Sequence, residues 1–538
     1  MEFLGAAAPF SVRSMSETLY SAFQASARRH ADRRAIFDAG RSLTYRQVEA
    51  LSRRAGRAFL ALGLERADPV SIWANNRWEW ALAGLGLQAA GGVLVPHGTR
   101  LRAGEVAEVM RRTRSRLLFC DPGYGDYSFV DAIAGEHLPD LATIVAFDAE
   151  GGARRSRAGR IMSFEHFLGL ADRVGEAALD ARIAGASPEE VADIFFTSGT
   201  TGTPKGVPMT HAQSLAACAM QQADITHFVP EDVFAVAYPF GHNAGYRAGW
   251  QVTFLYGASI IPVRSYQPAD IMRMIEAQRV TILPAAPPIW RAILDHPDRP
   301  IYDLSSLRIV STGGTMVPVR LIEELQDSFG RRTVSTGYGL TEVAGSVTNT
   351  REDDDARTIA TTTGRPLRGV SIKILDGERR EVAQGQPGEI AIKAPQVLHG
   401  YFQDAAATRA AFTADGYFLT GDVGVFDDAG NLKITDRLKD MYIVGGFNCY
   451  PAEIERILLT LDGVASVAVI GVEDERLGQV GKAFIVRKPD ARLDEAAVIA
   501  WSRDNMANYK APRSVTFLDA MPLNAMGKIA KTELTKMG

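Results

Sequence analysis

Apolar residues recur along this chain with two periods, which together predict alternating helices and strands. Between residues 44 and 62 an apolar residue occupies every third or fourth position, the spacing of a helix face that packs on a sheet. A short apolar run at 70–73 followed by a helical pattern at 77–90 predicts a buried strand and then a helix. The same alternation predicts strands at 92–96, 280–284 and 307–311 and helices at 271–278 and 318–329. This order is typical of α/β proteins.

The pattern changes toward the C-terminus. From residue 388 onward short strands and turns dominate, as at 389–393 and 432–435. A charged segment at 436–440 precedes a compact unit with predicted strands at 465–472 and 514–518 and a helix at 494–506. We therefore expect a domain boundary at the charged segment. The predicted organisation is a disordered leader at 1–14, with Met15 as an alternative start, an N-terminal domain at 15–436 and a C-terminal domain at 440–538.

Composition narrows the classes of function. A chain of 538 residues is too long for one hydrophobic core, so two or more domains are expected. The net charge is only -4, from 63 acidic and 59 basic residues, so a nucleic-acid partner is not expected. Three widely spaced cysteines predict neither disulfides nor a zinc site, which suits a reducing cytoplasm. No apolar run approaches the roughly 18 residues of a membrane span, so no integral membrane association is expected.

The most informative stretch is 194–206, where an apolar run leads into Thr-Ser-Gly-Thr-Thr-Gly-Thr-Pro-Lys-Gly. Hydroxyl groups, glycine N–H groups and one lysine predict a loop that binds a polyphosphate, the alternative being a flexible surface linker. A Walker A loop does not fit, because Pro204 stands where its second glycine belongs and Gly206 follows the lysine. Since a helical pattern begins only near His211, we expect the loop to join two strands. The candidate phosphate-binding residues are Thr197, Ser198, Gly199, Thr200, Thr201, Gly202 and Lys205.

A second chemical element is Gly337-Tyr-Gly-Leu-Thr-Glu342. Its glycines allow close approach of the backbone, and Tyr338 can stack on a base. Thr341 and Glu342 offer a hydroxyl and a carboxylate for phosphate and Mg²⁺. Taken alone, the element could equally be a simple glycine-rich turn.

Two further elements lie toward the C-terminus. Asp422 can accept hydrogen bonds from both ribose hydroxyls, and Arg437 carries donors suited to the same sugar. The alternative for the surrounding charged run is a solvated surface. Near the end of the chain, Lys528 follows a glycine in a turn, where a lysine is ordinarily a solvated surface residue.

The order of these motifs resembles that of the adenylate-forming superfamily, which includes acyl-CoA synthetases, luciferases and the adenylation domains of peptide synthetases. The resemblance covers residues 30–535. It implies a large N-terminal α/β domain of layered sheets and helices with a small β-subdomain, followed by a small mobile α+β domain. It also implies that Thr341 contacts the α-phosphate, that Glu342 binds Mg²⁺ and that Gly313 and Gly314 border the adenine. By the same resemblance, residues 437–439 would form a hinge with Lys439 as the hinge residue, and Lys528 would be the catalytic lysine.

The implied reaction consumes ATP, Mg²⁺ and CoA. A carboxylate is a poor acyl donor, so it first attacks the α-phosphorus of ATP and expels pyrophosphate, and AMP then serves as the leaving group toward a thiol. The resemblance places Gly445, Gly446 and Phe447 along the tunnel for the pantetheine arm. Because no carrier-protein segment follows Lys528 before Gly538, we expect free CoA as the acceptor, and a homodimer is compatible with the sequence.

The acid should bind near residues 238–249, which contain no carboxylate to pair with an ammonium group, so an α-amino acid is not expected. His242 could gate the pocket or orient the substrate carboxylate, or it could be structural. Arg247 could contact a ring ketone or a backbone carbonyl. The small residues Ala244, Gly245, Ala248 and Gly249 are expected to leave room for a bulky apolar acid.

At finer grain, residues 242–249, 352–356 and 434–442 resemble bacterial ligases that activate the propanoate side chain of steroid-ring intermediates with a hydrindane nucleus. Medium- or long-chain fatty acids and aryl acids are the alternative substrates. A luciferase-type oxygenase would share every motif. A catalytically dead nucleotide-binding regulator would be expected to lack Lys528 or Glu342, and both are present.

Overall fold

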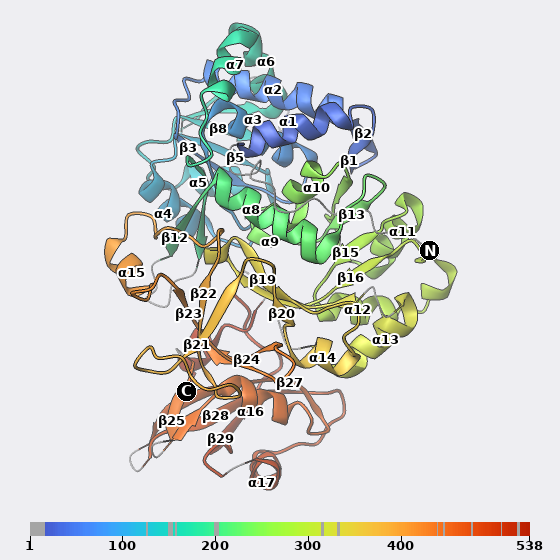
Figure 1. The fold of residues 1–538 in the computed structure, drawn as a ribbon, viewed down its shortest axis with the longest axis vertical. Coiled ribbons are helices and arrows are strands. Elements are labelled where there is room, and N and C mark those ends of the chain that lie inside the picture. The colour runs from blue at the N-terminus through green and yellow to red at the C-terminus, as the bar shows by residue number, and fades with distance from the viewer. Residues whose placement is uncertain are drawn as a thin grey trace. The chain divides into compact units, whose positions relative to one another are not determined.

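The computed structural model separates the chain into two compact units, which are described one at a time. The first comprises residues 1–361, 365–370 and 394–410, and the second comprises residues 362–364, 371–393 and 411–538 (Figure 1). The described residues are 17–124, 127–148, 154–156, 159–197, 204–313, 317–330, 334–437, 440–444, 447–474, 477–506, 508–524 and 528–537.

A seven-stranded sheet forms one layer of the first unit. All its neighbouring pairs are parallel except β1 with β2. Parallel neighbours require crossover connections, and the helices predicted between these strands supply them. In spatial order the strands are β17 (Val334–Ser335), β16 (Ile309–Ser311), β15 (Ile282–Pro284), β13 (Val233–Val236), β14 (Ser259–Pro262), β1 (Arg34–Asp38) and β2 (Arg41–Thr44).

An eight-stranded sheet forms a second layer. Its centre is parallel and its two edge strands, β12 and β9, pair in antiparallel fashion. Strands β3, β4, β5 and β8 are buried almost throughout, as expected for parallel strands covered on both faces. The spatial order is β12 (Lys205–Thr210), β11 (Val191–Thr197), β4 (Val93–His97), β3 (Pro69–Trp73), β5 (Leu117–Cys120), β8 (Thr143–Ala146), β10 (Gly159–Ser163) and β9 (Arg154–Ser156).

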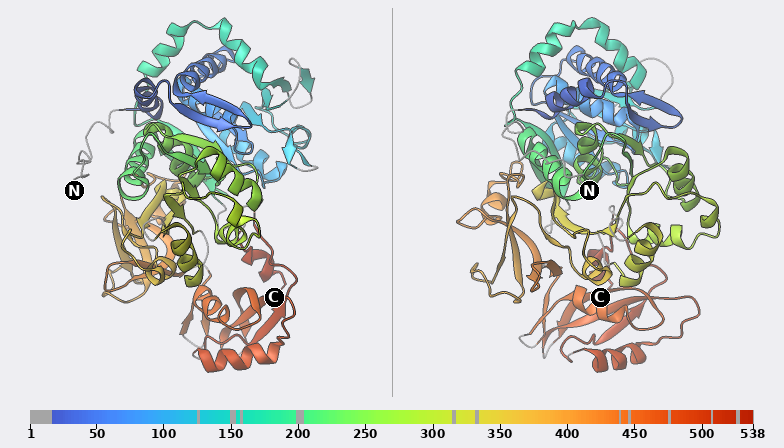
Figure 2. Two further views of the ribbon diagram at one scale, coloured as in Figure 1. Left: turned by 90° about the vertical axis from the view of Figure 1, so that its right-hand side faces the viewer. Right: turned by 45° about the vertical axis from the view of Figure 1, so that its right-hand side comes forward.

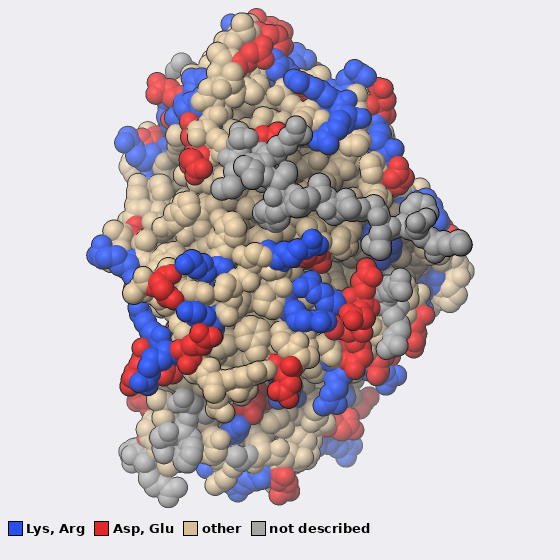
Figure 3. Space-filling model, viewed as in Figure 1, with Lys and Arg blue, Asp and Glu red and all other residues tan. Residues whose placement is uncertain are grey.

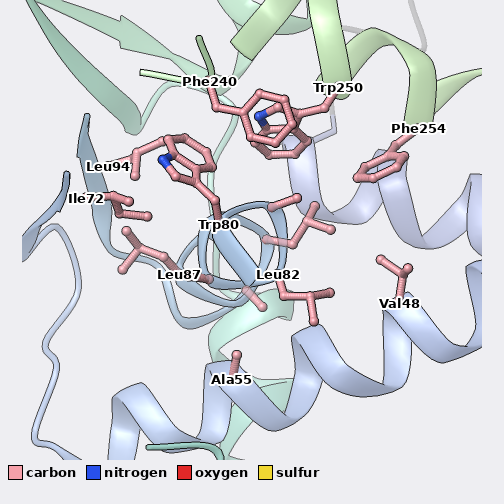
Figure 4. Packing of buried hydrophobic residues seen from close by; sticks show 14 of the residues in the cluster. Val48, Ala55, Ile72, Trp80, Leu82, Leu87, Leu94, Phe240, Trp250 and Phe254 are labelled. Atoms are coloured by element: carbon pink, nitrogen blue, oxygen red, sulfur yellow. The ribbon is translucent and has the colours of Figure 1, made fainter. Parts of the chain in front are cut away.

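The central helix of this unit is α3 (Trp78–Ala90), in which every residue from Glu79 to Ala90 is buried. A helix that is apolar on all sides must be surrounded by other elements. Figure 4 shows Trp80 of this helix facing Phe240 and Trp250, with Val48 and Ala55 of α2 (Tyr45–Ala61) on another side. The ring centroid of Trp80 lies 5.6 Å from that of Phe240 and 5.9 Å from that of Trp250. The hydrophobic core therefore continues up to the segment predicted to bind the acid.

The remaining helices of the first unit cover its sheets. Helix α7 runs beside α2 (Figure 2), where Arg53 and Arg57 of α2 form ion pairs with Glu176 of α7. These helices are α1 (Leu19–Arg29), α4 (Ala103–Thr113), α5 (Phe129–Ala134), α6 (Phe164–Gly169), α7 (Glu176–Ala184), α8 (His211–Gln221), α10 (Val252–Leu255), α11 (Pro268–Gln278), α12 (Pro287–Leu294), α13 (Val319–Phe329), α14 (Ala356–Thr361) and α15 (Ala405–Ala410). A small antiparallel sheet consists of β18 (Gly337–Leu340), β19 (Gly345–Asn349) and β20 (Arg365–Pro366).

The second unit contains two sheets. A four-stranded antiparallel sheet consists of β21 (Ser371–Leu375), β22 (Gly388–Lys393), β23 (Phe418–Phe426) and β24 (Leu432–Arg437). A five-stranded sheet consists of β26 (Phe447–Cys449), β25 (Tyr442–Val444), β28 (Gly478–Arg487), β27 (Val464–Asp474) and β29 (Ser514–Phe517), which pairs with β28. Helices α16 (Pro451–Leu458), α17 (Glu495–Asn505) and α18 (Lys531–Thr535) accompany it.

Most predicted elements are present, with ends shifted by a few residues. The predicted strand at 280–284 begins at Ile282, and Val280 N instead donates to Ile275 O at the end of α11. The predicted hinge at 437–439 stays a prediction, because residues 438 and 439 and the side chain of Arg437 lie outside the described part of the chain.

On the face shown in Figure 3, Lys and Arg side chains are interspersed with Asp and Glu. Within the described residues, no helix is both long enough and apolar enough to span a bilayer.

Candidate active site

The predicted phosphate loop connects two antiparallel strands. Thr197 at the end of β11 is the register partner of Lys205 at the start of β12, and helix α8 begins only at His211. The prediction of a strand–loop–strand unit, in contrast to a Walker A loop, is therefore confirmed. Thr197 Oγ1 lies 3.5 Å from the carbonyl oxygen of Lys205. The candidates Ser198, Gly199, Thr200, Thr201 and Gly202 lie outside the described residues.

Two side chains that the sequence did not suggest, Arg112 and Tyr401, hold the end of this loop. The guanidinium of Arg112, on α4, donates to the carbonyl oxygen of Pro204 and lies 5.1 Å from the ring centroid of Phe196. The ammonium of Lys205 lies 4.8 Å from the ring centroid of Tyr401. A cation over an aromatic ring is attracted by the negative face of that ring. Lys205 is thus held by an aromatic side chain far away in the sequence.

Glu342 lies on a short 3₁₀ turn, η7 (Thr341–Val343), that links β18 to β19. The hydroxyl of Tyr401 donates to Glu342 Oε1 at 3.3 Å, and the backbone N of Leu398 donates to the carbonyl oxygen of Glu342 at 2.8 Å. Burial and the charge of Glu342 raise the pKa of Tyr401, so its hydroxyl keeps its proton at neutral pH. Thr341 precedes Glu342 in the same turn and is half-buried. The predicted Thr-Glu pair is therefore presented by a defined turn.

Gly313 and Gly337 follow neighbouring parallel strands. Ser311 of β16 pairs with Ser335 of β17. Gly313 comes two residues after Ser311, and Gly337 comes two residues after Ser335. The carboxyl ends of adjacent parallel strands form the usual ligand-binding edge of an α/β sheet. Gly313 has a φ of +151°, a conformation that favours glycine. The structure thus brings together the two segments predicted near the base, with Tyr338 half-buried beside them, whereas Gly314 lies outside the described residues.

His242 caps a short helical turn, α9 (Asn243–Gly245), in the predicted acid-binding segment. Its Nδ1 accepts a hydrogen bond from the backbone N of Ala244 at 3.2 Å, so the ring proton of the neutral imidazole lies on Nε2. Just upstream, the buried side chain of Asn76 holds the backbone. Its Nδ2 donates to the carbonyl oxygens of Val236 and Tyr238, and its Oδ1 accepts from the N of Phe240.

Arg247 does not have either of the roles considered from the sequence. It lies in a π-helical turn, η4 (Tyr246–Gln251), and its buried guanidinium forms an ion pair with Asp193 of β11. It also donates to Ser214 Oγ at 3.0 Å and to Asn243 Oδ1 at 2.6 Å. Burial raises the pKa of Asp193 to about 6, against the opposing effect of Arg247. Arg247 therefore joins the strand of the phosphate loop to the acid-binding segment from inside the core.

The small residues of this segment do not all open space, contrary to the expectation from the sequence. A Cβ on Gly245 would lie 2.2 Å from the carbonyl oxygen of Pro239, and one on Gly249 would lie 2.9 Å from the side chain of Val236. These two glycines are required because the backbone folds closely on itself. Of the four small residues in this segment, Ala244 and Ala248 are partly exposed, whereas Gly245 and Gly249 are buried.

In the second unit, the two predicted ribose-binding residues are cross-strand neighbours. Asp422 on β23 is the register partner of Arg437 on β24. Asp422 is buried, and its backbone N donates to Thr420 Oγ1 at 3.1 Å. Lys439, Gly445 and Gly446 lie outside the described residues, and of Phe447 only the backbone, in β26, is described.

Lys528 is exposed, and its backbone is hydrogen-bonded to Asn524. Its N donates to Asn524 Oδ1 at 3.0 Å, and its carbonyl oxygen accepts from the N of Asn524 at 2.7 Å. The next residue, Ile529, packs against a small cluster that contains Phe484 and Leu534. A long exposed side chain thus extends from an anchored backbone.

Comparison with known proteins identifies the family. The family model described as "AMP-binding enzyme" matches residues 23–402, and the model "AMP-binding enzyme C-terminal domain" matches residues 453–528. The chain belongs to the AMP-binding enzyme family. The predicted α/β fold class, with a large N-terminal and a smaller C-terminal domain, is confirmed.

Relatives of this AMP-binding enzyme cover nearly its whole length. It is 43% identical over 513 residues to a 3-[(3aS,4S,7aS)-7a-methyl-1,5-dioxo-octahydro-1H-inden-4-yl]propanoyl:CoA ligase of Mycobacterium tuberculosis, which spans 94% of this chain and 96% of that protein. It is 40% identical to the ligase of the same name from Rhodococcus jostii, over 96% of this chain and 98% of that protein. ATP-bound MatB from Rhodopseudomonas palustris has a similar structure, with a TM-score of 0.82 at 28% identity, covering 97% and 99% of the two chains. The predicted enzyme class, an AMP-forming acyl-CoA synthetase, is confirmed.

The residues of this AMP-binding enzyme fit a Mg²⁺ ion held jointly with a nucleotide. Among the described residues no group of three or more His, Cys, Asp or Glu side chains could form a closed metal site. Mg²⁺ prefers oxygen ligands and is commonly held by one or two carboxylates together with water and substrate phosphates. The carboxylate of Glu342, on a turn beside Lys205 and Tyr401, offers such a ligand.

Proposed function

We propose that this AMP-forming acyl-CoA synthetase acts on a bulky apolar carboxylic acid of the hydrindane-propanoate type. Acid, ATP and CoA give acyl-CoA, AMP and pyrophosphate through an acyl-adenylate. The identities of 43% and 40% to ligases named for such an acid carry the proposal. The absence of a carboxylate from residues 238–249 supports it, because the substrate needs no partner for an ammonium group.

In the first half-reaction the substrate carboxylate attacks the α-phosphorus of ATP. The negative charges of the acid and the triphosphate repel each other, so the site must offset them. Thr197, Lys205 and the loop at 198–202 would bind the β- and γ-phosphates, and Thr341 would donate to the α-phosphate. Glu342 would hold Mg²⁺, which supplies positive charge to the phosphate oxygens. His242 would face the incoming carboxylate from the acid-binding segment.

Separate groups of residues would bind the base and the ribose of the nucleoside. Gly313, Gly314, Gly337 and Tyr338 would border the adenine, with the tyrosine ring available for stacking. Asp422 and Arg437, which are paired in register on β23 and β24, would bind the ribose hydroxyls.

The second half-reaction needs a different arrangement of the catalytic groups. Lys528 would stabilise the transition state of adenylation and then withdraw, so that the thiol of CoA reaches the acyl-adenylate. The domain division at 436, the hinge at 437–439 and the C-terminal domain at 440–538 would provide that movement about Lys439. Gly445, Gly446 and Phe447 would line the path of the pantetheine arm. A cytoplasmic location and a homodimeric state remain predictions.

The test is an acid panel in two assays. Carboxylate-dependent exchange of pyrophosphate into ATP and formation of acyl-CoA are measured with a hydrindane propanoate, straight-chain acids of medium and long chain length, and aryl acids. We expect the highest kcat/KM with the bicyclic propanoate. A higher kcat/KM with a straight-chain or aryl acid would replace the proposed substrate, and exchange with none of the acids would overturn the proposed function.

A further inference from the structure

Tyr401 lies between Lys205 and Glu342, two residues that would bind ATP and its metal ion in the proposed function. Its ring centroid is 4.8 Å from Lys205 Nζ, and its hydroxyl is 3.3 Å from Glu342 Oε1. The two neighbours carry opposite charges and come from strands and turns more than a hundred residues apart in the sequence. One side chain therefore contacts both a phosphate-binding cation and a metal-binding carboxylate.

The backbone around Tyr401 is fixed on the side of the phosphate loop. The N of Phe402 donates to the carbonyl oxygen of Gly206 at 2.8 Å, and the ring of Phe402 makes an edge contact with that of Phe196. A Cβ on Gly206 would lie 2.8 Å from the Cβ of Phe402. Glycine at 206 thus allows the segment that carries Tyr401 to lie directly against β12.

The same segment is fixed on the side of Glu342 and of α8. The N of Leu398 donates to the carbonyl oxygen of Glu342, and Gln213, which also caps α8, donates to the carbonyl oxygen of Val397. The N of Tyr401 itself donates to Thr408 Oγ1 at 2.9 Å. With the backbone held on three sides, the position of the tyrosine ring is set by the fold.

We propose that Tyr401 is a positioning residue of the nucleotide site, in which its ring places the ammonium of Lys205 and its hydroxyl orients the carboxylate of Glu342. The inference rests on the proposed function, because that function supplies the nucleotide and Mg²⁺. A carboxylate has several lone pairs, so Glu342 can accept the phenolic hydrogen bond and still bind a metal ion. Hydrogen bonds to a metal-binding side chain fix its orientation and strengthen metal binding.

Two variants separate the ring from the hydroxyl. Tyr401→Phe keeps the ring under Lys205 and removes the hydrogen bond to Glu342. Tyr401→Leu removes both contacts. Binding of ATP is measured by calorimetry without any acid substrate, once with excess Mg²⁺ and once with a chelator, and binding of AMP is measured alongside.

For Tyr401→Phe we expect ATP affinity in Mg²⁺ to fall about 10-fold, with affinity in chelator unchanged. For Tyr401→Leu we expect a further loss of about 2- to 5-fold that persists in chelator, because the ring contact to Lys205 does not need the metal. AMP lacks the β- and γ-phosphates, so its affinity should stay at the wild-type value in both variants.

Tyr417→Phe is the matched control. Tyr417 also donates or accepts a hydroxyl hydrogen bond, with Ser371, and carries Lys373 over its ring at 4.5 Å. This variant should leave all three affinities unchanged. The inference would be overturned if Tyr401→Phe bound ATP in Mg²⁺ as tightly as the wild type does. It would also be overturned if Tyr401→Leu bound ATP in chelator as tightly as the wild type does. Equal losses for AMP and ATP would also overturn it, since they indicate a general structural role. A wild-type enzyme that binds ATP but activates no acid would instead contradict the proposed function.

Discussion

The phosphate side and the acid side of the first unit are held in different ways. Lys205 and Glu342 on the phosphate side are partly exposed, and their contact with Tyr401 consists of one cation–ring contact and one hydrogen bond. On the acid side, by contrast, Asp193 and Arg247 are fully buried, and the guanidinium of Arg247 contacts three side chains: Asp193 of β11, Ser214 of α8 and Asn243 of α9. The first set keeps polar groups available to a ligand, whereas the second uses its polar groups to fix the backbone.

This difference separates catalytic effects from effects on stability. Partly exposed groups that contact a ligand can be changed at little cost to folding. Buried charges cannot, because removal of one member leaves the other without compensation in a medium of low dielectric constant. Substitutions on the phosphate side should therefore lower activity, and substitutions on the acid side should lower the free energy of unfolding.

The largest expected effect on folding is that of Arg247→Met. Burial already raises the pKa of Asp193 against the effect of Arg247. Without Arg247 the buried carboxyl would either stay charged and unpaired or take up a proton, so we expect the free energy of unfolding at neutral pH to fall by about 3–5 kcal/mol. The double variant Arg247→Met/Asp193→Leu should recover a large part of that loss, because no buried charge is left. The measurement is urea denaturation followed by intrinsic fluorescence.

Arg279→Ala provides the comparison for that experiment. Its ion pair with Asp303 is exposed on both sides, so its removal should cost less than about 1 kcal/mol. A loss for Arg247→Met as small as that for Arg279→Ala would show that the buried network is not what fixes the acid side.

On the phosphate side, Glu342→Gln should lower activity and leave stability unchanged. The neutral amide keeps the size of the side chain and an oxygen that can face Tyr401, but it loses the charge that would hold Mg²⁺. We expect pyrophosphate exchange to fall by about 100-fold or more, since charge stabilisation by a metal ion is worth several kcal/mol. The melting temperature should stay within the error of the wild-type value. Glu352→Gln, at an exposed acidic position ten residues away in the sequence, should change neither quantity.

The sequence predicted the phosphate side better than the acid side, and the reason is physical. A strand–loop–strand unit around 198–203 and the Thr341–Glu342 turn depend on local patterns of glycines, hydroxyls and charges. Such patterns are visible in a linear chain. The alternation of helices and strands was likewise visible, and the fold class followed from it.

The acid side depends on contacts between distant segments. Arg247 lies in the segment predicted to bind the acid and was considered as a contact to a ring ketone or a backbone carbonyl. Its partner Asp193, however, lies in a strand more than fifty residues earlier. Gly245 and Gly249 looked like space for a substrate, although their missing side chains are needed for close backbone packing. Tyr401 carries no motif of its own, since a cation–ring contact leaves no spacing pattern. Only the folded chain places these residues.

A smaller effect than that of Arg247→Met should come from Asn76, which fixes the acid side without carrying a charge. Asn76→Ala would leave the carbonyl oxygens of Val236 and Tyr238 and the N of Phe240 without their present partner, so we expect unfolding to become easier by about 1–3 kcal/mol. Because these groups precede His242, the KM for the acid should rise while the KM for ATP stays unchanged. Asn76→Asp is the sharper variant, since it has the same shape but would point a carboxylate oxygen at two carbonyl oxygens, and it should cost more than alanine. If Asn76→Asp were as stable as the wild type, or if the KM for ATP rose together with that for the acid, the separation of the two sides would fail.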